Sequence, residues 1–205
     1  MKSARHLATI ALALLLTGCF WQGPAFYTAD PSIVGPIAPG RYKMDILGDH
    51  EPAFRIVVTR LEDGSLSFDE AKPATGDHGE RLVFAPLMVA GRKLWIVQGT
   101  DGSVSSRPPA GADDVTYGLM EWHGDVLEME QAIPCQGSEA IVQAAGGTVT
   151  GRPELGADGT PDHPRSGDLV CRFTDRAALE RALVAYAGLH PAFSMRVRLK
   201  RIADR

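Results

Sequence analysis

Histidines next to carboxylates are the residues of this sequence best suited to acid–base or metal chemistry. Four segments combine the two side-chain types: Asp49-His50-Glu51, Asp77-His78-Gly79-Glu80, Trp122-His123-Gly124-Asp125 and Asp162-His163. If these segments met in space, imidazole and carboxylate groups could bind zinc or act as a general acid and base. Each segment lies at a predicted turn, however, and none places two histidines on one face. The sequence therefore assigns no catalytic residue, no metal ligand and no cofactor.

The chain also lacks the short motifs of several common reactions. It contains no Gly-x-Ser-x-Gly, no phosphate-binding loop, no Gly-x-Gly-x-x-Gly, no His-Glu-x-x-His and no EF-hand calcium loop. The 21 basic and 25 acidic residues give a net charge of −4, which argues against a globally basic nucleic-acid binder. These features favour a binding or assembly module over an enzyme. A hydrolase that uses histidine and carboxylate groups is the alternative.

The N-terminus combines a basic start, a short apolar run and a cysteine. Lys2 and Arg5 precede an apolar run over residues 7–16. As a helix, this run would span roughly 15 Å, about half of the hydrocarbon core of a bilayer. It is too short for a transmembrane helix and fits a secretory signal. The run ends in Leu16-Thr17-Gly18-Cys19, which resembles the lipobox of bacterial lipoproteins.

This resemblance implies a chemical modification and a location. In such lipoproteins the thiol corresponding to Cys19 receives a diacylglyceryl group, and a signal peptidase cuts between Gly18 and Cys19. The new amino group is then acylated, with palmitate as the expected chain. Phe20 follows Cys19 where an Asp would favour the inner membrane. The resemblance therefore implies an exported protein, anchored by lipid to the outer membrane and facing the periplasm. Separately, an envelope protein or a glycan is the expected further partner, and the charge balance argues against nucleic acid.

The other two cysteines, Cys135 and Cys171, suit an oxidising compartment. Two cysteines that remain after lipidation of Cys19 predict a disulfide. Closing the loop from residue 135 to residue 171 would stabilise the fold by roughly 3–4 kcal/mol. A pair of reduced thiols in the core is the rival interpretation. A zinc site is disfavoured because neither cysteine has a second cysteine or histidine within a few residues.

The sequence predicts a signal peptide over residues 1–18, a lipidated tether over 19–39, and one globular domain over 40–203. Four prolines argue against a helix or central strand in the tether: Pro24, Pro31, Pro36 and Pro39. Its aromatic residues either lie in the membrane interface or pack back on the domain: Phe20, Trp21, Phe26 and Tyr27.

From Gly40 onward, the pattern predicts mostly strands. Alternating residues indicate a strand near 42–46, and three hairpins are expected over 53–68, 81–98 and 115–131. A helix is predicted over 139–145, capped by Ser138. A second is predicted to run to about Ala187, capped by Thr174 or Asp175 and ended by Gly188. Short strands are expected over 168–173 and 192–202. The predicted fold is α+β and β-dominant: an antiparallel meander or barrel-like curved sheet with two helices on one side.

Two further features have competing interpretations. Trp95 and Trp122 could line a ligand pocket if the sheet closes, or they could simply be core residues; a carrier of apolar ligands would need a cavity of roughly 300 Å³. The last predicted strand carries four cations: Arg196, Arg198, Lys200 and Arg201. They could contact anionic lipid head groups or glycan phosphates, or they could protect an edge strand from pairing with other chains.

Overall fold

The computed structural model describes residues 20–30, 32, 35–48, 52–70, 80–100, 114–151 and 169–203. The signal peptide, Cys19 and the histidines at positions 50, 78 and 163 lie outside these residues. Predictions that concern them are not addressed by the structure.

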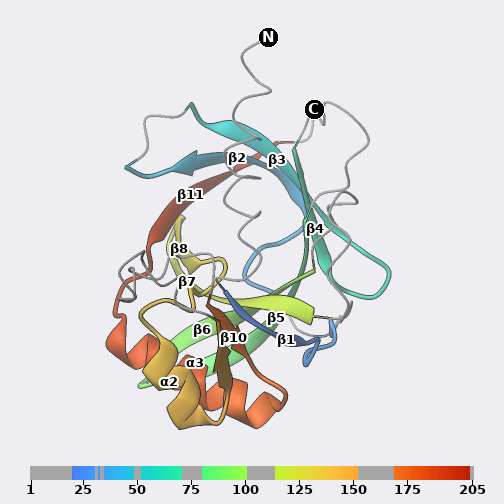
Figure 1. Cartoon of the computed structure of the whole chain (residues 1–205). Coiled ribbons are helices and arrows are strands. Elements are labelled where there is room, and N and C mark those ends of the chain that lie inside the picture. The colour runs from blue at the N-terminus through green and yellow to red at the C-terminus, as the bar shows by residue number, and fades with distance from the viewer. Residues whose placement is uncertain are drawn as a thin grey trace, which may run out of the picture.

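Eight strands form a closed antiparallel barrel, which confirms the predicted β-dominant fold with two helices. Around the barrel, their order is β6-β5-β4-β3-β2-β11-β8-β7, and a further pairing between β6 and β7 closes it. The bounds are β2 (Gly40–Ile46), β3 (Phe54–Arg60), β4 (Leu66–Glu70), β5 (Glu80–Val89), β6 (Arg92–Thr100), β7 (Asp114–His123), β8 (Val126–Glu130) and β11 (Met195–Ile202). Figure 1 shows β2 and β3 on one side of the barrel and the helices on the other.

The three predicted hairpins are present. In the hairpin of β5 and β6, Val89 pairs with Arg92, so that Ala90 and Gly91 alone make the turn. Both have positive φ, 49° and 83°, as a tight two-residue hairpin turn requires. Pro86 lies opposite Trp95 on β6. β5 pairs with β4 only near its start, before Pro86, so the missing N–H of Pro86 removes no hydrogen bond between β5 and β4.

The prediction that prolines exclude a central strand from residues 19–39 is wrong for residues 21–24, which pair with a strand on each side. Trp21–Pro24 form β1, which pairs antiparallel with β7 and parallel with β10 (Val170–Arg172). β9 (Thr148–Thr150) extends this small sheet from β10. Pro24 is tolerated because it is the last residue of β1. The aromatic residues of the segment pack back on the domain, and Trp21 is completely buried.

The helices are α2 (Glu139–Ala145) and α3 (Arg176–Leu189). The Asp175 carboxylate accepts hydrogen bonds from the backbone N–H groups of Ala177 and Ala178 and so caps α3. Gly188 does not end this helix, which continues for one further residue. Ser138 precedes α2 but makes no side-chain cap. Its hydroxyl instead accepts a hydrogen bond of 2.8 Å from the Trp21 indole.

Two hydrophobic cores result. The first fills the barrel with inward-facing side chains, among them Ile56, Val58, Val97 and Leu127. The second lies between the outer wall of β5, β6 and β7 and the helix layer, and it includes Leu94 and Ile96 of β6. The disulfide between Cys135 and Cys171 belongs to this second core, with a Cα–Cα distance of 5.3 Å. It joins the segments that lead into α2 and α3.

Candidate functional site

The outward face of β3, β2 and β11 carries a row of cations. Lys43 on β2 lies directly opposite Arg55 on β3 and opposite Lys200 on β11. Arg41 lies on the same face of β2, two residues before Lys43. All four side chains are exposed, whereas the intervening Tyr42 points into the barrel core. We call Arg41, Lys43, Arg55 and Lys200 the cationic row.

None of the four makes an ion pair or side-chain hydrogen bond within the described ranges of the chain. The other cations of β11 do have partners. Arg196 pairs with Glu128 at 3.1 Å, and Arg198 pairs with Asp125 at 3.4 Å. Arg201 donates to the Pro39 carbonyl at 3.2 Å. Of the four cations that the sequence singled out, only Lys200 therefore contributes to the row.

The interpretation of these cations as protection of an edge strand is wrong. β11 pairs with β2 along one side and with β8 along the other, so it has no free edge to protect. Lys43 and Arg55 lie on interior strands of the same closed barrel. Another reason is needed for three adjacent like charges, because such charges directly opposite one another destabilise a sheet.

The row is suited to binding closely spaced anions. Neighbouring strands lie about 4.8 Å apart, so Arg55, Lys43 and Lys200 offer positive charges at regular short intervals. Arginine can hold a phosphate or carboxylate through two N–H groups, and lysine acts as a point charge. On the same face, Asp45 lies opposite Arg198 at the border of the row.

The histidines in the described part of the chain do not form an acid–base site. His123 Nε2 lies 3.6 Å from Glu121 Oε2, beyond hydrogen-bonding distance. Both oxygens of Glu121 accept hydrogen bonds from Arg92, and this bonding raises the pKa of the Arg92 guanidinium. His190 stacks on the ring of Tyr186 and contacts its carbonyl oxygen. Within the described residues, no group of three or more His, Cys, Asp and Glu side chains could hold a metal ion.

Trp95 and Trp122 both face the barrel interior. Trp95 is buried opposite Met120, and Trp122 follows two residues later on the same face of β7. The Trp122 indole donates to the Gly124 carbonyl, and the Lys93 ammonium lies 5.0 Å from the Trp95 ring centre. Neither tryptophan lines either of the two pockets described below. Trp95 belongs to the inner core, and the partly buried Trp122 packs against it.

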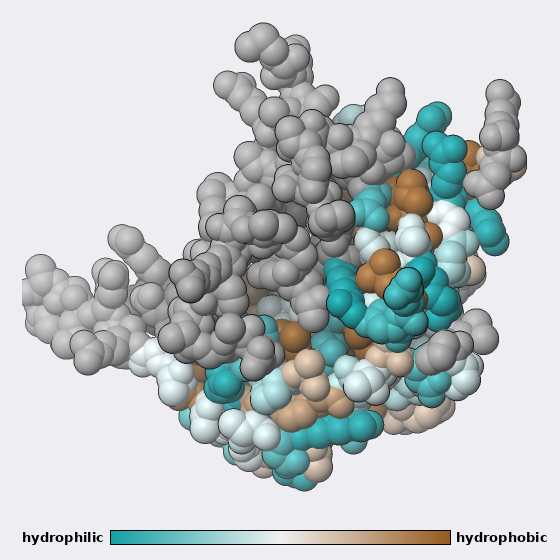
Figure 2. Space-filling model, turned by 90° about the vertical axis from the view of Figure 1, so that its right-hand side faces the viewer, coloured by the Kyte–Doolittle hydropathy of each residue, from teal (hydrophilic) through white to brown (hydrophobic). Residues whose placement is uncertain are grey.

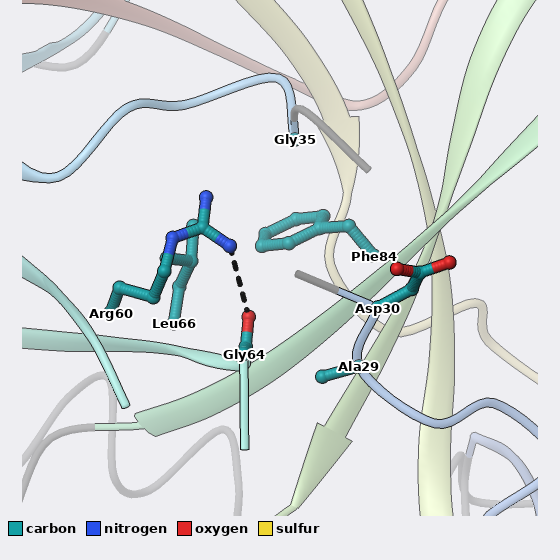
Figure 3. A pocket seen from close by; sticks show the side chains of 7 residues that line it. All are labelled: Ala29, Asp30, Gly35, Arg60, Gly64, Leu66 and Phe84. Carbon is teal, nitrogen blue, oxygen red and sulfur yellow. Dashed lines mark hydrogen bonds between the residues drawn. The ribbon is translucent and has the colours of Figure 1, made fainter. Parts of the chain in front are cut away.

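The first pocket lies between Ala29, Asp30 and Gly35 on one side and residues at the β3–β4 turn and on β5 on the other. Figure 3 shows Asp30 and Arg60 beside the ring of Phe84, with Arg60 donating to the Gly64 carbonyl at 3.4 Å. Hydrogen bonds from Ser32 lower the pKa of Asp30. The water-accessible volume of this first pocket is about 20 Å³, which suits about one water molecule rather than a ligand.

The second pocket is an open groove of about 360 Å³ between α2 and α3. Small and apolar side chains line most of it: Ala140, Ile141, Ala144, Ala145 and Ala185, with Arg181 as the charged residue. This is a surface feature, unlike the internal cavity near Trp95 that an apolar-ligand carrier was expected to have. On the side of the molecule drawn in Figure 2, the described hydrophobic residues instead form small areas separated by polar ones.

Side chains of the barrel hold the N-terminal segment in place. Gln98 is buried, accepts from the Tyr27 backbone N–H and donates to its carbonyl, each at 2.9 Å. The Tyr117 hydroxyl donates to the Pro24 carbonyl. Burial, assisted by the Glu180 carboxylate, raises the pKa of Tyr27, and burial also raises the pKa of Tyr117. Both phenols therefore stay neutral and keep their hydrogen bonds at physiological pH.

Sequence reasoning missed three members of the cationic row: Arg41, Lys43 and Arg55. The spacing of Arg41 and Lys43 was a signal that both lie on one face of β2. Their proximity to Arg55 and Lys200 depends on strand pairing, which the sequence did not specify.

Comparisons with models of protein families, with curated proteins and with solved structures find no match to this chain. Among the described residues, no helix has the length and apolar character needed to cross a membrane.

Proposed function

We propose that the protein is a lipid-anchored binding module of the bacterial cell envelope, and that its cationic row binds a phosphate-bearing glycan. The lipobox-like segment ending at Cys19 supports the anchor. The disulfide between Cys135 and Cys171 is compatible with export, because such bonds persist in oxidising compartments.

One observation carries the binding role. Lys43 lies between Arg55 and Lys200, all three exposed, on a barrel whose other described β11 cations are neutralised by neighbours or bonded to backbone. The arrangement costs stability in the isolated protein. An anion with closely spaced charges would offset that cost, and a phosphorylated polysaccharide carries such charges.

Inorganic polyphosphate is the simplest probe of this site. We expect it to bind with an affinity that falls as salt rises, because bound cations displace counterions. The double variant Lys43→Gln/Lys200→Gln should bind about tenfold more weakly, with a salt dependence shallower by about one to two charges. The control is Lys93→Gln/Arg196→Gln, which removes the same number of charges away from the row.

Three outcomes discriminate between interpretations. A larger loss of polyphosphate affinity in the Lys43→Gln/Lys200→Gln variant than in the control supports the proposal. Equal losses would mean that polyphosphate responds only to net charge, and the proposed site would be wrong. Tighter binding of poly-L-glutamate than of polyphosphate would assign the row to an acidic protein surface instead.

A further inference from the structure

The chain enters the fold directly after the expected lipidation site. Phe20 forms a β-bridge with Pro134, and the Trp21 backbone N–H donates to the Ile133 carbonyl at 2.9 Å. One residue of chain spans at most about 3.6 Å. A lipid on Cys19 would therefore be separated from the folded body by no linker. The surface beside Phe20 would have to lie against the bilayer.

The N-terminal end of α2 lies close to this entry point, because Phe20 bridges Pro134 and the Trp21 indole bonds to Ser138, just before α2. Arg181 on α3 donates to the Ala145 carbonyl at the C-terminal end of α2, so the other end of the groove between α2 and α3 is formed by Ala140 and Ala185. Along the chain, these two exposed residues lie within two positions of the buried residues that Trp21 contacts from the barrel side of the helices. The ring centre of Trp21 lies 5.5 Å from that of Tyr186 on α3.

The surface around the groove has the character of a membrane-contacting face. Ala140, Ala144 and Ala185 are exposed along it. On α3, Leu189 follows Ala185 by one turn and is 69% exposed, and the neighbouring Val184 is 41% exposed. Small side chains let a surface approach the acyl boundary closely, and buried apolar area adds to the hold of a lipid anchor. Arg181 can meet lipid phosphates at the rim.

We infer that this face of α2 and α3 rests on the bilayer into which the acyl chains of Cys19 insert, an inference that rests on the lipid anchor proposed above. The occupant of the groove is the boundary between head groups and acyl chains of that membrane. The body of the protein is then seated on the membrane rather than suspended from it.

This seating fixes the direction of the cationic row. The helices cover the outer wall around β6, and β2 is four strands away from β6 in either direction around the barrel. Figure 1 shows the helices and β2 on opposite sides. The row, centred on β2, therefore faces away from the anchoring membrane. Its partner must approach from the periplasm and is not a head group of that membrane.

The experiment uses the chain from Cys19 to Arg205 with its disulfide intact, so that Cys19 carries the free thiol. This thiol is alkylated with tetradecylmaleimide, because a single chain of this length binds membranes only marginally and added contacts become measurable. Partition is measured on vesicles of phosphatidylethanolamine with a minor share of phosphatidylglycerol. The variant Ala144→Glu/Ala185→Glu places two anions on the groove face. The matched control, Ala38→Glu/Thr59→Glu, places them at exposed positions elsewhere.

We expect the groove variant to partition at least about tenfold more weakly than the control, because the anionic vesicle surface repels carboxylates placed against it. Circular dichroism verifies that both variants are folded. On vesicles, Lys43 and Lys200 should react with a water-soluble amine reagent as fast as in solution. Equal partition of the two variants, or protection of Lys43 and Lys200 by vesicles, would overturn the seating. Mass spectrometry of protein from its native cells that showed no acyl group on Cys19 would instead refute the proposed anchor, so the two failures are distinguishable.

Discussion

Two opposite walls of the barrel, around β6 and around β2, differ in how their outer faces are covered. On β6, outward-facing Leu94 and Ile96 and inward-facing Trp95 and Val97 are all buried, because the helix layer covers the outer face. On β2, apolar residues face inward and cations face solvent. The number of covered faces thus determines whether a strand reads as a continuous apolar run or as an alternation.

The covered wall also explains the fate of the N-terminal segment. Trp21 and Tyr27 belong to the core between barrel and helices, so residues 20–30 complete that wall instead of linking it to a distant anchor. The opposite wall, by contrast, carries like charges directly opposite one another. The following predictions test that division.

Removing the disulfide should have the largest effect on stability. The double variant Cys135→Ser/Cys171→Ser should lose about 4 kcal/mol of unfolding free energy, because the open chain regains the entropy of a 36-residue loop. Urea unfolding followed by tryptophan fluorescence measures the loss. Reduction of the wild-type protein should reproduce it, and a loss below about 1 kcal/mol would contradict a stabilising role for the bond between the segments that lead into α2 and α3.

Truncating the buried face of α3 should come next. Leu183 is completely buried, so Leu183→Ala should cost about 3 kcal/mol through lost burial and a cavity. Its neighbour Val184 is 41% exposed and provides the matched control. Val184→Ala should cost less than about 0.5 kcal/mol. Equal losses in urea unfolding would mean that α3 does not pack on the barrel through the face described.

Alkaline pH should weaken the covered wall selectively. Burial raises the pKa of Tyr27 and Tyr117, and raises that of Tyr186 to about 12. In the unfolded chain these tyrosines ionise near pH 10, at lower pH than in the folded protein. Their contribution to the free energy of unfolding is therefore intact below about pH 10 and is lost as pH rises further. We expect the free energy of unfolding to fall by about 2 kcal/mol between about pH 10 and pH 11. Tyr186→Phe should give a shallower fall; a slope unchanged from wild type would contradict the assignment.

Neutralising the centre of the cationic row should have the smallest effect, and it should have the opposite sign. Lys43→Gln should raise stability by about 0.5 kcal/mol by relieving repulsion with Arg55 and Lys200, while weakening polyphosphate binding. Arg196→Gln, which breaks the pair with Glu128, should not raise stability. A gain in both variants would point to net charge rather than to the row.

Local chemistry made much of the fold predictable. The Asp63-Gly64, Ala90-Gly91 and Gly124-Asp125 turns, with apolar runs on either side, determined the hairpins. β1 was not predictable, because a four-residue strand containing Gly23 and Pro24 has little local preference and depends on β7 and β10 for its hydrogen bonds. The same applies to Ser138, whose hydroxyl could cap a helix but is engaged by Trp21 across the fold.

The amino-acid sequence by itself determined the hairpins, the approximate positions of the helices and the alternation that directs Arg41 and Lys43 outward. It did so because turn chemistry and hydrophobic periodicity act over short stretches, and the even number of remaining cysteines favoured a disulfide without excluding free thiols. The tertiary structure alone decided that β11 is an interior strand, that Lys200 lies beside Lys43, and that residues 20–30 belong to the folded body. These outcomes depend on which distant segments pair and on how the barrel closes, and such long-range contacts leave no signature within any one segment.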